Sequence, residues 1–209
     1  MFMLLLAFSV NPKLIALWLV QVMPKSTLRK LMLHKRRLLS GQQVTEASLI
    51  IQSRFIATAE FSKATVVALY MPLNNEVATS KVLSLALAEG KTVLAPVVCG
   101  EGLVFRQIRN TSDLRPGAFG ILEPDVCSTE FPLQSIDIIV VPGVVFDIYG
   151  RRIGFGKGFY DKILHPLEGK GRLLGFCYDF QLIDEIAGEH HDVKMDMIIT
   201  EKRVINSLF

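Results

Sequence analysis

Helical periodicities and short apolar runs alternate along most of the chain. Leucine and methionine recur at spacings of three, four and seven residues over 25–40, which predicts a first helix there. Further helices are predicted over 44–60 and 77–89 from the same kind of pattern. Continuous apolar runs lie at 65–70, 92–96, 136–142, 173–177 and 197–200, and each is the length of a strand.

The character of these runs predicts the fold class. They are continuous rather than alternating, which is typical of strands buried on both faces of a sheet. Strands that alternate with helices indicate a mainly parallel sheet with helices on both sides. The stretch 98–135, rich in glycine and proline, is interpreted as a hairpin and loop within the same domain. We therefore predict one α/β domain over 23–209, a three-layer α/β/α sandwich.

Residues 1–22 form an apolar leader that is interrupted by Asn11-Pro12-Lys13. The leader has neither the early positive charge nor the small-residue cleavage site of a signal peptide. Its polar interruption lies near the middle, where a membrane span tolerates charge and proline least. We favour a mis-assigned start, with Met23 as the natural first residue, because Pro24-Lys25 opens the first predicted helix. A membrane anchor is the alternative.

The amino-acid composition and net charge indicate which kind of ligand or macromolecule the chain binds. Half of the 209 residues are hydrophobic and 21% are charged, with a net charge of +3. This mild positive charge suits an anionic small molecule, and no nucleic-acid-binding signature accompanies it. Three cysteines without a C-x-x-C pair indicate neither a disulfide framework nor a zinc site. We predict a cytoplasmic monomer that binds small molecules, not nucleic acid or membrane.

The segment 142–162, PGVVFDIYGRRIGFGKGFYDK, is the strongest candidate for a functional site. It follows the most hydrophobic predicted strand, and ligands of open parallel sheets bind beyond the carboxyl ends of strands. Gly154, Gly156 and Gly158 allow backbone N–H groups to approach a phosphate at the start of the next helix. Positive charge around this glycine loop comes from Arg151, Arg152 and Lys157. The spacing fits neither the Rossmann nor the Walker A pattern, and alone it equally fits a flexible turn.

The same segment closely resembles the signature of the 5-formyltetrahydrofolate cyclo-ligases, or methenyltetrahydrofolate synthetases, which reads P-G-x-x-F-D-x-x-G-x-R-L-G-x-G-x-G-Y-Y-D. Further resemblances follow in the family's order, at KSTLR (25–29), EVAT (76–79), GILEP (120–124) and the HD…D segment (191–196). The resemblance covers 25 to about 201. It implies an enzyme that uses ATP and Mg²⁺ to close 5-formyltetrahydrofolate to 5,10-methenyltetrahydrofolate. ATP would phosphorylate the formyl oxygen, N10 would attack, and ADP and phosphate would be released.

The resemblance assigns ATP to the first helix and the glycine loop. Lys25 and Arg29 correspond to phosphate contacts, although the residues alone also fit a solvated basic face. The loop residues implied in ATP binding are Arg152, Gly154, Gly156, Lys157, Gly158, Phe159 and Tyr160. Lys157 and Tyr160 would be catalytic, with Lys157 as a point charge near the γ-phosphate or formyl oxygen.

Two departures and one exception qualify this assignment. Phe159 stands where many relatives have tyrosine, so any role of a hydroxyl there is absent. Lys30 and Arg37 are interpreted as surface residues without a functional role. Among the remaining basic residues of the helix, Arg36 is the one excepted from this surface interpretation. Some relatives carry an acid where this chain has Ala78.

The folate is assigned to a second group of residues. Met71 and Glu76 correspond to substrate contacts, with the Glu76 carboxylate on the pterin ring. Their alternatives are a buried core methionine and the acid of a helix start. The loop residues implied in folate binding are Gly156, Lys157, Gly158, Phe159 and Tyr160.

Asp161 and Asp196 correspond to the Mg²⁺ ligands, since magnesium prefers a few carboxylate oxygens besides phosphate and water. The residues alone also fit a first-turn helix acid and a strand-start cap, respectively. Asp147 and Gly150 are interpreted as a D-x-x-G turn. The adjacent histidines and acid at 190–192 are interpreted as structural, because no third ligand has a suitable spacing.

Two other functions are compatible with parts of the sequence. A sugar-phosphate isomerase or CoA-transferase-like enzyme would use the glycine loop without ATP chemistry. A non-catalytic nucleotide- or folate-binding protein would not need the full set of loop residues. Because Lys157, Tyr160 and Asp161 are all present, we favour the active enzyme.

Overall fold

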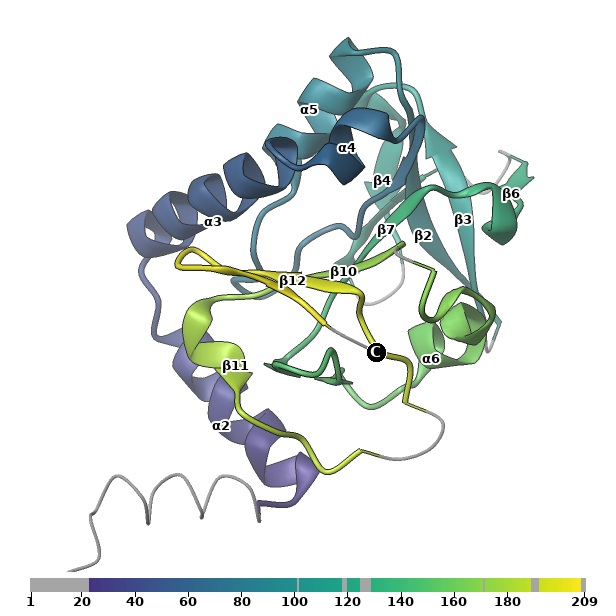
Figure 1. Ribbon diagram of the computed structural model, residues 1–209. Helices are drawn as coiled ribbons and strands as arrows, with labels where there is room; N and C mark the ends of the chain where they lie inside the picture. The colour runs from purple at the N-terminus through teal and green to yellow at the C-terminus, as the bar shows by residue number, and fades with distance from the viewer. Residues whose placement is uncertain are drawn as a thin grey trace, which may run out of the picture.

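An eight-stranded sheet forms the centre of the computed structural model, which describes residues 23–100, 102–117, 120–124, 129–170, 172–188 and 192–207 (Figure 1). The parallel strands are, in spatial order, β12 (Met197–Ile199), β10 (Leu173–Phe176), β7 (Ile138–Val141), β1 (Val66–Ala68) and β2 (Thr92–Cys99). Antiparallel strands flank them, namely β13 (Val204–Asn206) on one side and β3 (Gly102–Ile108) and β6 (Glu130–Phe131) on the other. The prediction of a mainly parallel sheet is confirmed. The leader, His190 and His191 lie outside the described residues.

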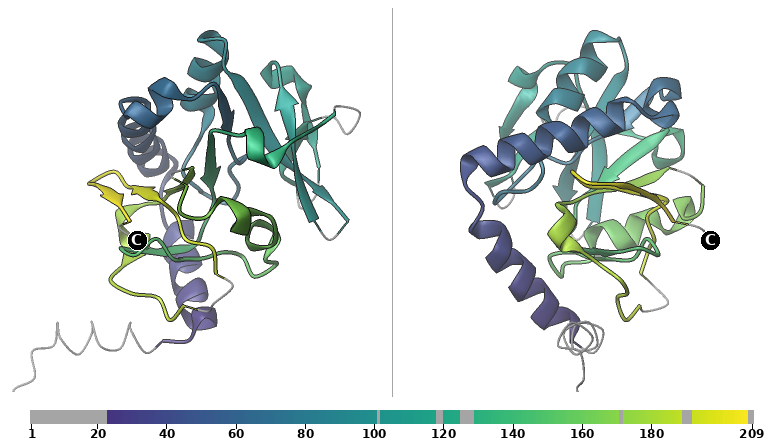
Figure 2. Two further views of the ribbon diagram at one scale, coloured as in Figure 1. Left: turned by 45° about the vertical axis from the view of Figure 1, so that its right-hand side comes forward. Right: turned by 60° about the vertical axis from the view of Figure 1, so that its left-hand side comes forward.

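Helices cover both faces of this sheet (Figure 2). The helices are α2 (Lys25–Arg37), α3 (Gly41–Ile56), α4 (Ala59–Lys63), α5 (Ser80–Ala88) and α6 (Phe159–Leu164). Short 3₁₀ turns lie at Thr111–Asp113, Leu133–Ser135, His165–Leu167 and Asp179–Gln181. Ile51 of α3 and Val82 of α5 pack with Val67 on one face, while Leu164 of α6 packs with Ala68 on the other. Consecutive residues of β1 therefore serve opposite layers, as a strand buried on both faces must.

Two small sheets complete the structure. One joins β11 (Leu182–Ile183), β8 (Val145–Asp147) and β9 (Arg152–Ile153), and the other pairs β4 (Leu114–Pro116) with β5 (Leu122–Pro124). Phe146 of β8 belongs to the same buried cluster as Leu164, so the three-stranded sheet shares the second face with α6. On the outside of the three-stranded sheet, α2 packs through Leu28 and Met32 onto Val145. The three-layer prediction holds, with this small sheet as an addition that the sequence pattern did not indicate.

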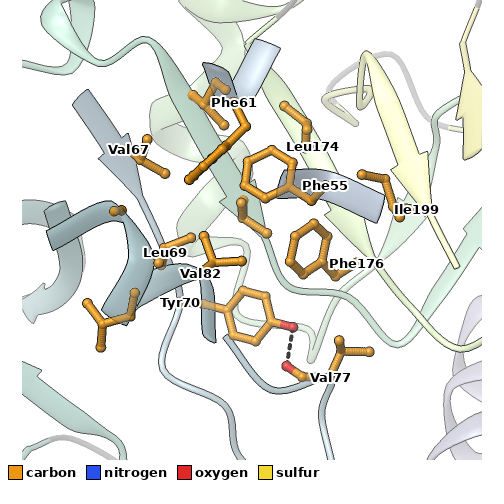
Figure 3. Packing of buried hydrophobic residues seen from close by; sticks show 14 of the residues in the cluster. Phe55, Phe61, Val67, Leu69, Tyr70, Val77, Val82, Leu174, Phe176 and Ile199 are labelled. Atoms are coloured by element: carbon orange, nitrogen blue, oxygen red, sulfur yellow. Dashed lines mark hydrogen bonds between the residues drawn. The ribbon is translucent and has the colours of Figure 1, made fainter. Parts of the chain in front are cut away.

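Several aromatic side chains pack together with aliphatic ones in the core between α3 and the sheet (Figure 3). The Phe55 ring lies edge-on to Phe61 at 5.1 Å and to Phe176 at 5.3 Å between ring centroids. Such edge-to-face pairs are favourable beyond the area that they bury. The buried Tyr70 hydroxyl donates a hydrogen bond of 2.7 Å to the Val77 carbonyl, which satisfies its polar group.

Two helix predictions need correction at their ends. The helix predicted over 44–60 is two helices, because α3 ends at Ile56 and Thr58 begins another. The Thr58 hydroxyl donates to the Phe55 carbonyl and accepts from the Phe61 N–H, so one side chain ends the first helix and caps the second. The helix predicted over 77–89 begins only at Ser80. Glu76 therefore does not start a helix but lies in the irregular segment before it.

Searched over its described residues, the structure contains no helix that is both long enough and apolar enough to cross a membrane. Cys99 is exposed and Cys177 is buried, and both are free thiols. The expectation that these two cysteines are not paired is confirmed.

Candidate active site

Three loops meet at one edge of the central sheet. Residues 69–79 follow β1, residues 142–158 follow β7, and Tyr178 follows β10. Because these three strands are parallel neighbours, their carboxyl ends lie together. The structure thus brings the glycine loop and the Glu76 segment to the same edge, as the sequence interpretation required.

A buried turn leads into the glycine loop. Asp147 is fully buried, and its Oδ1 accepts hydrogen bonds of 2.9 Å from the N–H groups of Tyr149 and Arg151. Its Oδ2 accepts another from the Ile186 N–H at 2.9 Å. Burial raises the pKa of Asp147, although these backbone hydrogen bonds oppose the rise. Gly150 closes the turn with a φ of 86°, and the predicted D-x-x-G turn is confirmed.

The loop glycines differ in what they contribute. Gly156 and Gly158 have φ values of 102° and 66°, a region that residues with side chains rarely adopt. Gly158 directly precedes α6 and serves as its N-cap residue. Gly154 does not have a positive φ, so its role is not one of backbone conformation. Lys157 lies between these two glycines with its side chain exposed to solvent.

The basic face of α2 lies directly on this loop. Arg29 Nε donates a hydrogen bond of 2.7 Å to the Gly154 carbonyl. A Cβ on Gly156 would lie 3.7 Å from the Arg29 guanidinium carbon. Lys25 Nζ lies 2.6 Å from Asp192 Oδ2, in the segment that precedes β12. An ordinary solvated face would make none of these contacts, so α2 folds over the loop as its assignment to ATP requires.

Arg36 and Glu76 form a buried pair of opposite charges. Arg36 is 1% exposed and Glu76 is 8% exposed. Arg36 Nη1 lies 3.6 Å from Glu76 Oε1, and Glu76 Oε2 accepts a hydrogen bond from the Leu73 N–H. Burial raises the pKa of Glu76 to about 7, although Arg36 and the Leu73 N–H lower it. Burial likewise lowers the pKa of Arg36, against the opposing effect of Glu76.

The remaining predicted ligand contacts are less exposed than Gly156 and Lys157. Met71 is 6% exposed and belongs to the core cluster, which fits its alternative as a core residue. Phe159 and Tyr160 are partly buried and pack against the cluster on the second face. Burial raises the pKa of Tyr160, with Glu76 adding to the rise and Arg152 opposing it. Tyr160 is therefore a neutral hydroxyl within the electrostatic reach of Glu76.

The two predicted Mg²⁺ ligands have different partners. Asp161 Oδ1 lies 2.9 Å from Arg152 Nη2 and accepts a longer hydrogen bond of 3.4 Å from the Val193 N–H. Asp196 Oδ2 accepts a hydrogen bond of 2.9 Å from the Leu173 N–H, which is the strand-start cap that the sequence left as the alternative. Among the described residues, no group of three or more His, Cys, Asp or Glu side chains is gathered for a metal. A two-carboxylate Mg²⁺ site stays a prediction.

Arg152, predicted to contact ATP, is 6% exposed and ties three segments together. Its Nη1 donates to the Val193 carbonyl at 3.0 Å, while Nη2 pairs with Asp161. Burial lowers the pKa of Arg152, and Asp161 opposes that effect. These contacts join β9, α6 and the segment before β12, so Arg152 holds together the elements on both sides of the glycine loop.

The sequence interpretation missed the turn that holds Arg36. Asn74 and Asn75 have φ values of 50° and 59°, which asparagine tolerates better than most residues. The Asn74 carbonyl accepts from Arg36 Nε, and Asn75 Nδ2 donates to the Arg36 carbonyl. An adjacent Asn-Asn pair after Pro72 is a turn signal, and it was the available clue in the sequence.

Known proteins give an independent comparison. The model of the 5-formyltetrahydrofolate cyclo-ligase family matches residues 21–201. A 5-formyltetrahydrofolate cyclo-ligase from Mycolicibacterium smegmatis is 32% identical over 88% of this chain and 97% of its own. The Escherichia coli K12 enzyme of the same name is 28% identical over 82% of this chain and 97% of its own.

Solved structures agree with these sequence relatives. The structure of 5,10-methenyltetrahydrofolate synthetase from Aquifex aeolicus is similar with a TM-score of 0.80 and 37% identity, covering 90% of this chain and 94% of that one. A 5,10-methenyltetrahydrofolate synthetase from Mycoplasma pneumoniae gives a TM-score of 0.71 and 27% identity over 86% and 99% of the two chains. The predicted resemblance and fold are confirmed, and the isomerase-like alternative is not supported. The chain belongs to the 5-formyltetrahydrofolate cyclo-ligase family.

Proposed function

We propose that this chain catalyses the ATP-dependent closure of 5-formyltetrahydrofolate to 5,10-methenyltetrahydrofolate. The formyl oxygen takes the γ-phosphoryl group and ADP leaves. N10 then attacks the formyl carbon and loses its proton, and the carbon–oxygen bond breaks with release of phosphate. The observation that carries the proposal is the seating of the α2 basic face on the glycine loop, at the sheet edge that also holds Glu76.

The phosphates of ATP are assigned to the side of the loop that faces α2. Phosphoryl transfer needs positioning and charge neutralisation more than covalent chemistry from the protein. Arg29 is already fixed against the loop by its hydrogen bond to Gly154, which leaves its planar fork beside Gly156. Lys157, exposed at the tip of the loop, supplies a flexible charge that can follow the transferring group. Lys25 would exchange its contact with Asp192 for a phosphate.

The folate ring is assigned to the side of the loop that faces Glu76. An ionised carboxylate accepts hydrogen bonds and donates none, so it recognises the ring N–H and amino groups of a pterin. Tyr160 lies within electrostatic reach of both Glu76 and Arg152 and, as a neutral hydroxyl, can donate to a developing negative charge. This arrangement would hold the formyl group between Glu76 and the loop lysine.

Mg²⁺ is assigned to Asp161, with Asp196 as the second acid. Within the part of the chain that the structure describes, Asp161 makes its contacts through Oδ1 and Asp196 through Oδ2, so each carboxylate has a second oxygen suited to a hard cation. When bound, Mg²⁺ supplies charge neutralisation of the phosphate oxygens. Arg152 would orient Asp161 through its hydrogen bond. We also expect one domain over 23–209, working as a monomer in the cytoplasm.

The test is to mix the purified chain with 5-formyltetrahydrofolate, ATP and Mg²⁺ and to follow the conjugated product by its near-ultraviolet absorbance. Product should form in the complete mixture and not when ATP is omitted. Lys157→Ala should lower kcat by about a hundredfold, as loss of a charge acting on the transition state does. Lys170→Ala removes an exposed lysine outside the loop and serves as the matched control.

The possible results separate the alternatives. A folded chain that binds ATP but forms no product would refute the enzymatic proposal and favour a binding protein. Product formation with equal rates for Lys157→Ala and Lys170→Ala would keep the reaction but remove Lys157 from the catalytic set. Asp161→Asn should weaken Mg²⁺-dependent ATP binding measured by calorimetry, and unchanged binding would rule out Asp161 as a ligand.

A further inference from the structure

The Arg36–Glu76 pair is buried, but its facing atoms are not hydrogen-bonded to each other. Its two side chains are more than nine-tenths buried, yet the separation of 3.6 Å between Nη1 and Oε1 exceeds hydrogen-bond distance. Arg36 Nη1 and Nη2 and Glu76 Oε1 have no hydrogen-bond partner in the described part of the chain. Buried polar atoms are almost always satisfied, so unsatisfied ones on two opposite charges require a reason.

Arg36 is held in place by neighbours other than Glu76. Its Nε donates a hydrogen bond of 3.0 Å to the Asn74 carbonyl. On another side, its guanidinium lies 5.5 Å from the centre of the Phe155 ring, in the glycine loop. Asn75 Nδ2 donates to the carbonyls of Arg36 and Leu39 and fixes the end of α2. Arg36 is therefore a fixed charge at the junction of α2, the segment after β1 and the glycine loop.

Stability alone does not account for this arrangement. A buried ion pair repays its desolvation only with good geometry and further hydrogen bonds, and this pair lacks both between its facing atoms. Glu76 instead turns Oε2 to the Leu73 N–H and keeps Oε1 for another partner. Such a carboxylate is suited to accept hydrogen bonds from a ligand.

We propose that Arg36 is a positioning residue of the folate site, whose fixed charge keeps the Glu76 carboxylate ionised and aimed at the ring N–H groups of the substrate. This inference rests on the proposed function and extends it to a residue that does not itself touch the substrate. Without Arg36, a carboxyl buried as deeply as Glu76 would hold its proton and lose its capacity as an acceptor. Arg36 thus sets the pH range over which folate binds.

The charged and titratable groups around Glu76 come from four segments. Arg36 faces it from α2, Tyr70 from the end of β1, Tyr160 from α6 and Tyr178 from the end of β10. Burial raises the pKa of each of the three tyrosines, so they stay neutral through the physiological range. Glu76 is the member of this set whose pKa, about 7, lies near neutrality.

The experiment measures binding of 5-formyltetrahydrofolate without ATP, by calorimetry from about pH 6 to about pH 9, the interval that brackets the pKa of Glu76. The full chain is compared with Arg36→Gln, Arg36→Lys, Glu76→Gln and Arg37→Gln. Arg37 is the exposed neighbour of Arg36, so Arg37→Gln removes the same charge from the same helix without touching Glu76. Circular dichroism verifies that each variant is folded.

The unchanged chain should lose folate affinity as the pH falls through about 7, and Glu76→Gln should abolish that dependence. Arg36→Gln should raise the midpoint by at least about one pH unit, and so weaken binding at neutral pH by about fivefold or more. Affinity should return toward the wild-type value at about pH 9, which a merely structural defect would not allow. Arg36→Lys should keep the wild-type midpoint. Arg37→Gln should change neither the midpoint nor the folate affinity.

Each alternative result has a definite meaning. Folded Arg36→Gln with the wild-type midpoint and affinity refutes the inference alone. Should Arg36→Gln fail to fold, the comparison with Glu76→Gln decides, because a pH dependence that persists without the carboxylate also refutes it. Absence of folate binding and product formation by the unchanged chain refutes the proposed function, and this inference with it.

Discussion

Replacement of Gly150 by alanine should destabilise the protein far more than its small size suggests. Gly150 has a φ of 86°, where an alanine costs about 1–2 kcal/mol from backbone strain. The added Cβ would also lie only 2.3 Å from the Met195 carbonyl oxygen and 2.9 Å from Ser207 Oγ. Since the Met195 N–H donates to the Gly150 carbonyl at 2.7 Å, the two backbones cannot separate without losing that bond. Overpacking adds about 1–3 kcal/mol, so the total loss should be about 2–5 kcal/mol.

The matched control is Gly90→Ala. Gly90 also has a positive φ, 73°, but a Cβ there would have no atom within 4 Å. Both substitutions reduce the freedom of the unfolded chain equally, so their difference isolates the close approach to Met195. Gly90→Ala should therefore cost only the backbone strain, about 1 kcal/mol.

The assay is urea unfolding followed by circular dichroism, with equal m-values required before free energies are compared. A loss of about 3 kcal/mol is a large share of the 5–15 kcal/mol that stabilises ordinary domains, so the midpoint shift should be plain. Equal losses for Gly150→Ala and Gly90→Ala, within about 0.5 kcal/mol, would refute the reasoning from close approach.

Three further outcomes are expected. Phe55→Ala should lower the free energy of unfolding by about 3–5 kcal/mol in urea titrations, because it removes a fully buried ring at the centre of an aromatic cluster; a loss below about 1 kcal/mol would contradict that packing. Glu76 has a folded-state pKa raised from 4.5 to about 7, so the folded state binds more protons between these values. The free energy of unfolding should fall as the pH rises through that window, by about 3 kcal/mol at most, and a Glu76→Gln chain with the same slope would contradict this. An alkylating reagent should modify the exposed Cys99 and spare Cys177, whose thiol pKa is raised by burial; mass spectrometry showing equal rates would exclude the buried position.

The sequence by itself determined the features that depend on local patterns. Continuous apolar runs between helical periodicities were enough for a mainly parallel sheet, because a strand buried on both faces leaves that signature wherever it lies. The D-x-x-G turn at Asp147 and Gly150 was also readable, since a turn is satisfied by residues within four positions. The family was readable because its residues occur in a specific order.

Only the tertiary structure decided which polar side chains are paired. The sequence marked Arg36 as an exception among the surface cations of its helix but gave no partner for it; it is fully buried because Asn74 and Glu76, some 40 positions along the chain, fold beside it. Asp161 was assigned to Mg²⁺ by the resemblance, with a first-turn helix acid as the alternative, and neither interpretation indicated its contact with Arg152.

These outcomes have one physical reason. Periodicity reports which side of a local element faces the core, whereas the partner of a charge depends on which distant segments the sheet order brings to one edge. Here β10, β7 and β1 place three separate loops together, and α2 covers them through contacts with residues more than a hundred positions away. The sequence therefore named the elements and the family, and the fold determined which charges meet.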